Sequence, residues 1–375
     1  MADSSDTTET ERAVRACRRE LPERFDGAKL VFGFDGVVDS VRTFVDKGRS
    51  RTEYDRIATL KAFRDRLDDS IAAESSLTVE WRTEGTRTGG HACHLSRVFD
   101  GLGADTTMIG TYGQPPREPF RSEFAGSTLV SIGAPGFCNA VEFDDGKLML
   151  AQASEAADLD WETLRDRIDP ASLAEHLDGA DLLGVGYWSM TPALPSLVST
   201  LVSETWPLQS SPPEHVFFDT GDVRNLPRDT LCKGAIRLEE TNEVVRTTVS
   251  ANRSETKALA AAFDGPEPST LTANAEQVYE GLGVTRFVGH SPSRAVTVSG
   301  GESVSIRVPR TDEPAMTTSA GDHFNAGFLL GHLAGLSNPA TTVVANAAAG
   351  SFVRTGSPPD YDDVAEFVDA YLEKF

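Results

Sequence analysis

Lysine is scarce in this 375-residue chain: only 7 of its 35 basic residues are lysine, whereas Asp and Glu together number 57. The net charge of −22 disfavours nucleic acid and anionic membrane surfaces as partners, because both would be repelled. An acid-rich, lysine-poor composition is also typical of proteins from salt-loving microbes, where high ionic strength screens the self-repulsion. We therefore expect a halophilic protein, although an ordinary acidic cytosolic protein has a similar balance.

Cysteine is equally rare, and its four copies form no CxxC pair. A disulfide framework and a zinc centre are both disfavoured by this spacing. The first residues, MADSSDTTETERAV, are acidic and polar, unlike a secretory signal peptide. No apolar run reaches the length that crosses a bilayer. Together these absences predict a cytoplasmic protein.

Two glycine motifs for nucleotide binding are also missing. The chain contains no GxxxxGK[ST], which disfavours a P-loop NTPase. The segment GVGYW (184–188) follows an expected strand but lacks the third glycine of the dinucleotide fingerprint. An oxidoreductase with a Rossmann fold is therefore only weakly supported.

The hydrophobic pattern that is present alternates between helices and strands, which predicts an α/β fold with a mostly parallel sheet and helices on both faces. Residues 1–20 are expected to form an acidic tail, disordered over 1–10, before a single domain over 21–375. Three strand-rich segments do not fit the sheet, and the last is a hairpin around Asp145 and Gly146. We expect them to form a small β-rich flap over one edge, approximately 41–52, 77–86 and 137–152. A helix is expected over 53–73.

The segment SAGDHFNAGF (319–328) places Asp322 at the start of a helical pattern. The first amides of a helix have no partner within it, and Ala320 and Gly321 leave them open to an anion. A carboxylate there would repel a phosphate unless it takes a proton from an attacking hydroxyl. Asp322 is therefore either a helix N-cap or a general base.

Two further stretches contain candidate ligand-binding groups. TGGHACH (88–94) brings Gly89 and Gly90 to a helix start, which suits either a tight turn or close approach to a polyhydroxy ligand. ANRSETKAL (251–259) places Asn252 and Glu255 three residues apart. Such a pair usually caps a helix, although an amide and a carboxylate also suit the water shell of Mg²⁺.

The remaining candidates have weaker signals. Asp35 and Asp39 follow the first strand, at the edge of an open sheet where ligands bind. His91 and His94 lie on one helix face, but nothing supplies further metal ligands, so a substrate-facing or capping role is expected. Tyr187 and the Trp that follows it are more typical of a core than of a sugar-stacking platform.

The order of these motifs resembles the ribokinase-like (PfkB) family of carbohydrate kinases over roughly 29–374. An early strand ending in Asp, a Gly-Gly pair, Asn-x-x-Glu and a late Gly-Asp entering a helix follow in the same order, and TTSAGDHFNAGF (317–328) is the most specific match. The resemblance implies a three-layer α/β/α core with a small β-rich lid, which in this family often mediates dimerisation. It also implies transfer of the γ-phosphate of Mg-ATP to a hydroxyl of a sugar or polyol.

The resemblance also implies roles for individual residues. Asp322 would be the catalytic base, with the amides of Ser319, Ala320 and Gly321 as the anion hole. Substrate would be bound by Asp35, Asp39, Gly89, Gly90 and His94. Nucleotide would be bound by Asn252, Glu255, His290, Asn346 and Gly356, with Asn252 and Glu255 acting on Mg²⁺ through water.

The chain departs from the family pattern at three places. Met316 replaces an acid six residues before Asp322, which puts a monovalent-cation site in doubt. His94 replaces the usual Asn, and HSPSRA (290–295) replaces a glycine-containing motif beside the nucleotide. A catalytically silent sugar- or nucleotide-binding regulator, a nucleoside kinase and an ADP-dependent sugar kinase remain alternatives. The acceptor is not identified by the sequence.

Overall fold

The computed structural model describes residues 4–25, 27–48, 50, 53–152, 154–263, 265 and 268–375. Its body is built on a nine-stranded sheet in the order β14-β13-β12-β11-β10-β9-β1-β5-β6. Neighbouring strands from β6 to β12 are parallel, and β13 and β14 are antiparallel. The strands are β1 (Lys29–Phe34), β5 (Asp105–Gly110), β6 (Thr128–Ser131), β9 (Leu182–Gly186), β10 (His215–Asp219), β11 (Arg246–Asn252), β12 (Arg286–His290), β13 (Arg294–Ser299) and β14 (Glu302–Arg307).

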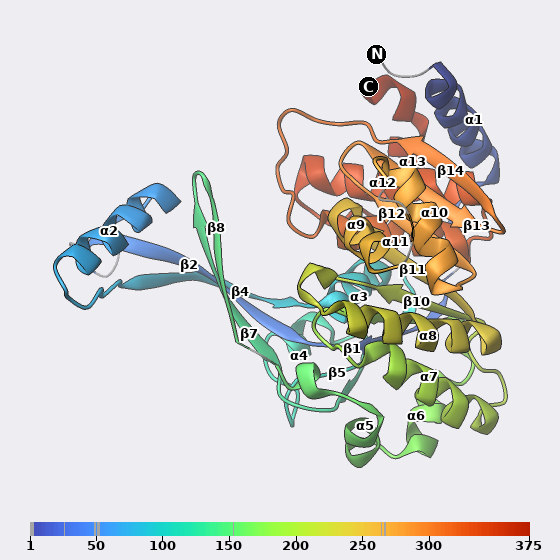
Figure 1. The fold of residues 1–375 in the computed structure, drawn as a ribbon, viewed down its shortest axis with the longest axis horizontal. Helices are drawn as coiled ribbons and strands as arrows, with labels where there is room; N and C mark the ends of the chain where they lie inside the picture. The colour runs from blue at the N-terminus through green and yellow to red at the C-terminus, as the bar shows by residue number, and fades with distance from the viewer. Residues whose placement is uncertain are drawn as a thin grey trace.

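Helices cover both faces of this sheet, which explains why its central strands are continuous apolar runs. One apolar core lies under α5 (Trp161–Arg167), α6 (Pro170–Leu177), α7 (Leu194–Thr205), α8 (Arg228–Val244), α9 (Arg253–Ala262) and α10 (Leu271–Leu282). The other core lies under α1 (Ser4–Glu20), α3 (His91–Gly101), α11 (Ala320–Leu333), α12 (Asn338–Thr355) and α13 (Tyr361–Asp369). The predicted three-layer α/β/α fold is confirmed (Figure 1).

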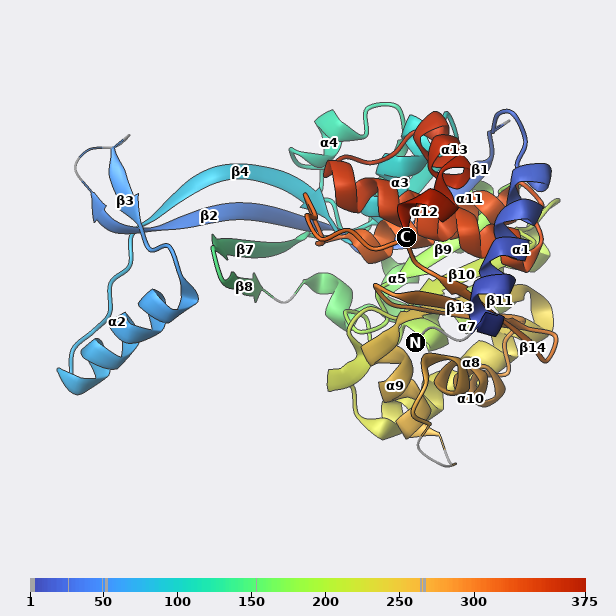
Figure 2. The same cartoon turned by 90° about the horizontal axis from the view of Figure 1, so that it is seen from above.

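A second, five-stranded sheet, here called the small sheet, projects from the body as an arm (Figures 1 and 2). It contains β2 (Val37–Gly48), β3 (Tyr54–Arg56), β4 (Trp81–Gly89), β7 (Gly136–Phe143) and β8 (Gly146–Gln152). The predicted hairpin around Asp145 and Gly146 is the turn between β7 and β8. A small apolar core holds α2 (Leu60–Ala72) against this sheet through Phe63, Phe44 and Phe143.

Two predictions near the N-terminus are corrected by the structure. Residues from Ser4 onward form α1, not a disordered tail, because Ala13, Val14 and Cys17 bury an apolar stripe against the body. Residues 1–3 lie outside the described residues. The helix predicted over 53–73 begins only at Leu60, since residues 54–56 pair with β2 and Thr59 caps the helix. Among the described residues, no helix combines the length and apolar character needed to cross a membrane.

Candidate active site

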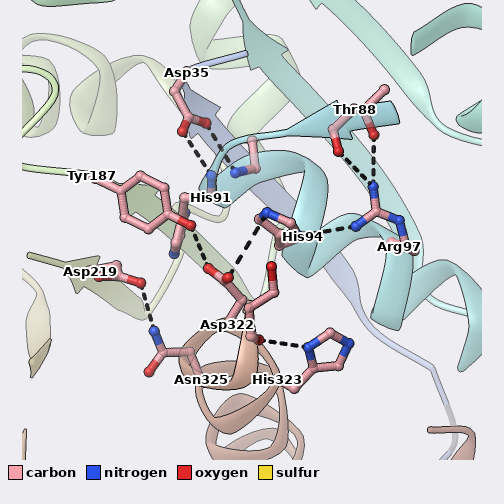
Figure 3. Close-up of polar contacts among 12 residues, drawn as sticks. Asp35, Thr88, His91, His94, Arg97, Tyr187, Asp219, Asp322, His323 and Asn325 are labelled. Atoms are coloured by element: carbon pink, nitrogen blue, oxygen red, sulfur yellow. Dashed lines mark hydrogen bonds and ion pairs between the residues drawn. The ribbon is translucent and has the colours of Figure 1, made fainter. Parts of the chain in front are cut away.

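The candidate site lies at the carboxyl ends of the central strands, where β1 separates the two directions of strand order. Open α/β sheets bind ligands at such a switch point, because the connecting segments diverge there and leave a crevice. The N-termini of α3 and α11 converge on this point, and Figure 3 shows their side chains facing one another. Asp35 follows β1, Tyr187 follows β9 and Asp219 ends β10.

Asp322 lies in the first turn of α11 and is nearly buried, with 8% of its surface exposed. The N-cap of this helix is Ser319, which has a left-handed backbone (φ 67°) and makes no side-chain capping hydrogen bond. The N-cap interpretation of Asp322 is therefore wrong. Its carboxylate instead accepts a hydrogen bond at Oδ1 from the Tyr187 hydroxyl at 2.5 Å, and Oδ2 lies 3.9 Å from His94 Nε2.

Tyr187 and Trp188 have different roles, which the sequence does not distinguish. Trp188 is buried in the core, as expected. Tyr187 points its hydroxyl at the Asp322 carboxylate (Figure 3). Burial raises the pKa of Tyr187 well above its usual range, so this hydroxyl remains a donor. The sequence expectation that favoured a core role for Tyr187 therefore missed its contact with the candidate base.

The two glycines that open α3 make room for two carboxylates. A Cβ on Gly89 would lie 2.5 Å from Asp39 Oδ2, and a Cβ on Gly90 would lie 2.6 Å from Asp35 Oδ2. Gly90 also has a backbone φ of +99°, which residues with a side chain rarely adopt. The two glycines are therefore explained by the close approach of the Asp39 and Asp35 carboxylates to the backbone.

Asp35 and Asp39 consequently differ in availability. Asp35 is fully buried and accepts hydrogen bonds from the amides of His91 (2.7 Å) and Ala92 (3.1 Å), so it caps α3. Burial raises its pKa to about 7, while the two amides lower it. Asp39 is partly exposed, and its pKa is raised by burial and lowered by the nearby Arg87 and other cationic groups. Of the two, Asp39 has the carboxylate available to a ligand.

Asp219 is a buried acid of the site that the sequence analysis did not single out. It accepts hydrogen bonds from Asn325 Nδ2 (2.7 Å) and from the amide of Gly221 (2.9 Å). Burial raises its pKa well above the usual range, and the charge of Asp322 adds to this shift. It is the last residue of the buried strand β10, and an acid at the end of a buried strand is the same kind of signal that drew attention to Asp35.

A large cleft of about 920 Å³ adjoins the N-terminus of α11. Ala320 and Gly321 line it, and the ring of His290 stacks on Phe324 with centroids 4.5 Å apart. Four cationic side chains also line this cleft, in a chain with a net charge of −22: Arg253, Lys257, Arg310 and Arg354. The cleft therefore concentrates positive charge beside the anion-binding end of a helix.

The predicted nucleotide residues are only partly assembled around this cleft. Asn252, His290 and Asn346 line it, although the Asn346 side chain also donates to the Tyr371 hydroxyl at 2.9 Å. Gly356 is not among the lining residues. It ends α12 as a left-handed C-cap (φ 74°), which is a structural role.

Asn252 and Glu255 form a complete capping box at the start of α9. Glu255 accepts from the Asn252 amide at 2.7 Å and from the Thr220 hydroxyl at 3.2 Å, and burial raises its pKa to about 7. Within the described ranges, no group of three or more His, Cys, Asp or Glu residues is placed to bind a metal directly.

The histidines predicted at the start of α3 are placed differently from each other. His91 is fully buried, stacked on Phe217 with ring centroids 6.1 Å apart. His94 faces the site, and Arg97 NH1 donates to its Nδ1 at 3.1 Å. Because arginine is always protonated and has no acceptor, Nδ1 must be the bare nitrogen of this ring. Burial lowers the pKa of His94, so the ring is neutral with its proton on Nε2.

The small sheet contacts the rim of the site through Lys147 at the start of β8. Lys147 Nζ donates to Thr318 Oγ1 at 2.7 Å, one residue before Ser319. The same ammonium pairs with Glu142 on β7 at 3.2 Å. The small sheet is therefore in contact with the segment that leads into α11.

This arrangement is that of a carbohydrate kinase with the ribokinase-like (PfkB) fold. A ribokinase from Arabidopsis thaliana complexed with ribose and ATP superposes with a TM-score of 0.61, at 16% identity, over 91% of this chain and 99% of that one. Phosphofructokinase-2 from Escherichia coli in complex with substrates and products gives a TM-score of 0.60, at 16% identity, over 92% of this chain and 99% of the other. At such identities these structures support the fold alone.

Within that class, the chain belongs to the prokaryotic ketohexokinase family, whose model matches residues 6–371. A ketohexokinase from Haloferax volcanii is 46% identical to it over 366 residues. The match covers 98% of this chain and 97% of the relative.

Proposed function

We propose that this carbohydrate kinase transfers the γ-phosphate of ATP to a hydroxyl of a ketohexose. The observation that carries the proposal is Asp322, a nearly buried carboxylate whose Oδ2 faces His94 beside an open helix N-terminus. The name of the Haloferax volcanii relative supports a ketohexose as acceptor. Asp39, Gly89 and Gly90 lie close together at the start of α3 and would form one side of the sugar site.

In the proposed reaction, Asp322 takes the proton of the attacking hydroxyl as its oxygen bonds to the γ-phosphorus. The bond from that phosphorus to the bridging oxygen breaks, and ADP leaves. The backbone amides of Ser319, Ala320 and Gly321 would face the transferring group, because the first amides of α11 lack helical partners and carry the positive end of its dipole. The Ala320 amide also donates to the Thr317 carbonyl at 3.3 Å, so it would share its proton between that oxygen and the phosphate. Stabilisation of this kind acts on the charge spread over the transferred oxygens.

The cationic cleft suits the nucleotide, since Arg253, Lys257, Arg310 and Arg354 oppose the negative charge of the whole chain. Mg²⁺ prefers oxygen ligands and retains much of its water. The side-chain oxygens of Asn252 and Glu255 fit this preference and would hold its water shell. When bound, Mg²⁺ neutralises charge on the phosphates. Met316 offers no carboxylate for a monovalent cation, so the proposal includes none.

The test is a panel of ketohexoses, aldohexoses, pentoses and nucleosides, assayed at high salt with Mg-ATP for release of ADP. We expect a ketohexose to give the highest kcat/KM, and chelation of Mg²⁺ to abolish turnover. A nucleoside as the best acceptor would point to a nucleoside kinase, and turnover with ADP in place of ATP would change the donor. The absence of turnover with every acceptor would favour the silent regulator.

We also propose that the small sheet pairs two copies of the chain. Three large apolar side chains of this sheet are exposed, with Trp81 at 48%, Met149 at 54% and Leu150 at 44%. An open sheet edge bearing apolar groups is suited to pairing with another chain. Sedimentation should therefore show a dimer that the double variant Met149→Lys/Leu150→Glu converts to monomer. The control Val244→Lys, at a site on the body that is 60% exposed, should remain dimeric, and a monomeric parent would contradict the proposal.

A further inference from the structure

A chain of contacts runs from the back of α3 to the candidate base Asp322, and its first member is Arg97. Arg97 donates through NH2 to the Thr88 hydroxyl (2.7 Å) and carbonyl (3.1 Å) and through Nε to Glu123 (2.5 Å). Its NH1 donates to Nδ1 of His94 at 3.1 Å. Every nitrogen of the guanidinium is therefore engaged, and Figure 3 shows the plane held against one edge of the imidazole.

The opposite edge of the imidazole faces Asp322. Tyr187 donates to Oδ1 of Asp322, which leaves Oδ2 as the oxygen free to take a proton. His94 Nε2 and Asp322 Oδ2 lie 3.9 Å apart, too far for a direct hydrogen bond. An oxygen placed about 2.8 Å from each of them fits this separation, at the apex of a triangle. A hydroxyl there would accept from His94 Nε2–H and donate to Asp322 Oδ2.

We propose that Arg97 is a positioning residue for phosphoryl transfer: it holds His94 as a neutral imidazole whose Nε2–H binds the acceptor hydroxyl beside Asp322. This inference rests on the proposed function. The hydroxyl oxygen then accepts from His94 Nε2–H through one lone pair and donates its proton to Asp322 Oδ2. Its second lone pair remains free to attack the phosphorus. On transfer, the proton passes to Oδ2 of Asp322, and His94 neither gains nor loses one.

The charges around His94 explain why Arg97 is needed. Asp322 and Asp39 face the ring and favour its protonation, whereas Arg97 and Arg87 oppose it. Burial is the largest cause of its lowered pKa, and His91 and His323 are the other titratable groups nearby. A protonated His94 would form an ion pair with Asp322 and occupy the base. Arg97 prevents this, because protonation at Nδ1 would place two donors against each other.

The test compares the pH dependence of kcat/KM for the sugar in the parent, Arg97→Met, Glu123→Gln and Arg97→Met/His94→Asn. In Arg97→Met the pKa of His94 should rise, so the acid limb should move up by about one pH unit, which is about a tenfold loss of kcat/KM on that limb. Glu123→Gln breaks the ion pair of Arg97 without touching the Nδ1 contact and should leave the limb in place. The double variant has no histidine at this position and should not show the shift.

A second measurement needs no turnover. Two-bond nitrogen–proton NMR spectra of ¹⁵N-histidine-labelled protein should show His94 as the neutral Nε2–H tautomer in the parent, and with a higher pKa in Arg97→Met. An Nδ1–H tautomer, an unmoved limb in Arg97→Met, an equal shift in Glu123→Gln or a shift that persists in the double variant would each overturn the inference. The expected tautomer in a protein that phosphorylates no acceptor would contradict the proposed function instead.

Discussion

Asp322→Asn is expected to lower kcat by about 10²–10⁴-fold, the usual contribution of a positioned general base. The amide of the variant keeps the shape of the side chain and its contact with Tyr187, but it cannot take the proton of the acceptor hydroxyl. Removal of a negative charge from a site that also holds buried Asp219 and Asp35 should not weaken nucleotide binding. Steady-state kinetics and titration calorimetry with nucleotide would separate these effects.

A matched control is Asp160→Asn, which alters the N-cap of α5, where the carboxylate accepts from the amide of Thr163 at 2.8 Å. This change should cost some stability and leave kcat close to that of the parent. If Asp322→Asn turned over within about threefold of the parent, the base would have to be another group. Equal losses of kcat in both variants would indicate a general structural defect.

The parts of the fold that the sequence predicts are those with a strong local pattern. β1, β9 and β10 are buried on both faces and are visible as short apolar runs. α8 and β11 have no such pattern, so the sequence does not predict them. α8 buries a narrow stripe that includes Gly234 and Thr241, and β11 is rich in buried Thr and Ser, so neither stands out by hydrophobicity.

The candidate site divides in the same way. Asp322, Gly89 and Gly90 are found from the sequence because each motif is local, a helix entered through small residues. Tyr187 reaches Asp322 across 135 residues, and Asn325 reaches Asp219 across 106, so only the fold brings these pairs together. The tautomer of His94 likewise depends on Arg97, whose role is visible only once the guanidinium is seen bound to Thr88 and Glu123.

The availability of a carboxylate also required the structure. Asp35 and Asp39 are equivalent in the sequence, as acids that follow the first strand. In the structure the Asp35 carboxylate accepts hydrogen bonds from two amides of α3, whereas Asp39 remains partly exposed. The same distinction applies to Glu255, whose carboxylate is engaged in the capping box of α9. Helix starts at a sheet edge use the same residue types for capping and for chemistry.

Gly90→Ala is expected to lower the free energy of unfolding by about 2–4 kcal/mol, with a loss of activity. The alanine would have to keep the backbone φ of +99°, and its methyl group would lie 2.6 Å from Asp35 Oδ2. Backbone strain of this kind costs about 1–3 kcal/mol, and displacement of Asp35 from the amides of His91 and Ala92 removes a helix cap worth about 1 kcal/mol more.

The loss of activity follows because α3 begins at this cap and carries His94 into the site. Denaturant unfolding and kcat/KM for the sugar, measured beside Gly85→Ala, check both effects. Gly85 lies on β4, the strand that leads to Gly90, and a Cβ there meets nothing within 4 Å, so its substitution should change stability by less than about 1 kcal/mol. Equal stability of the two variants would show that α3 does not depend on Gly90 to bring Asp35 to its first amides.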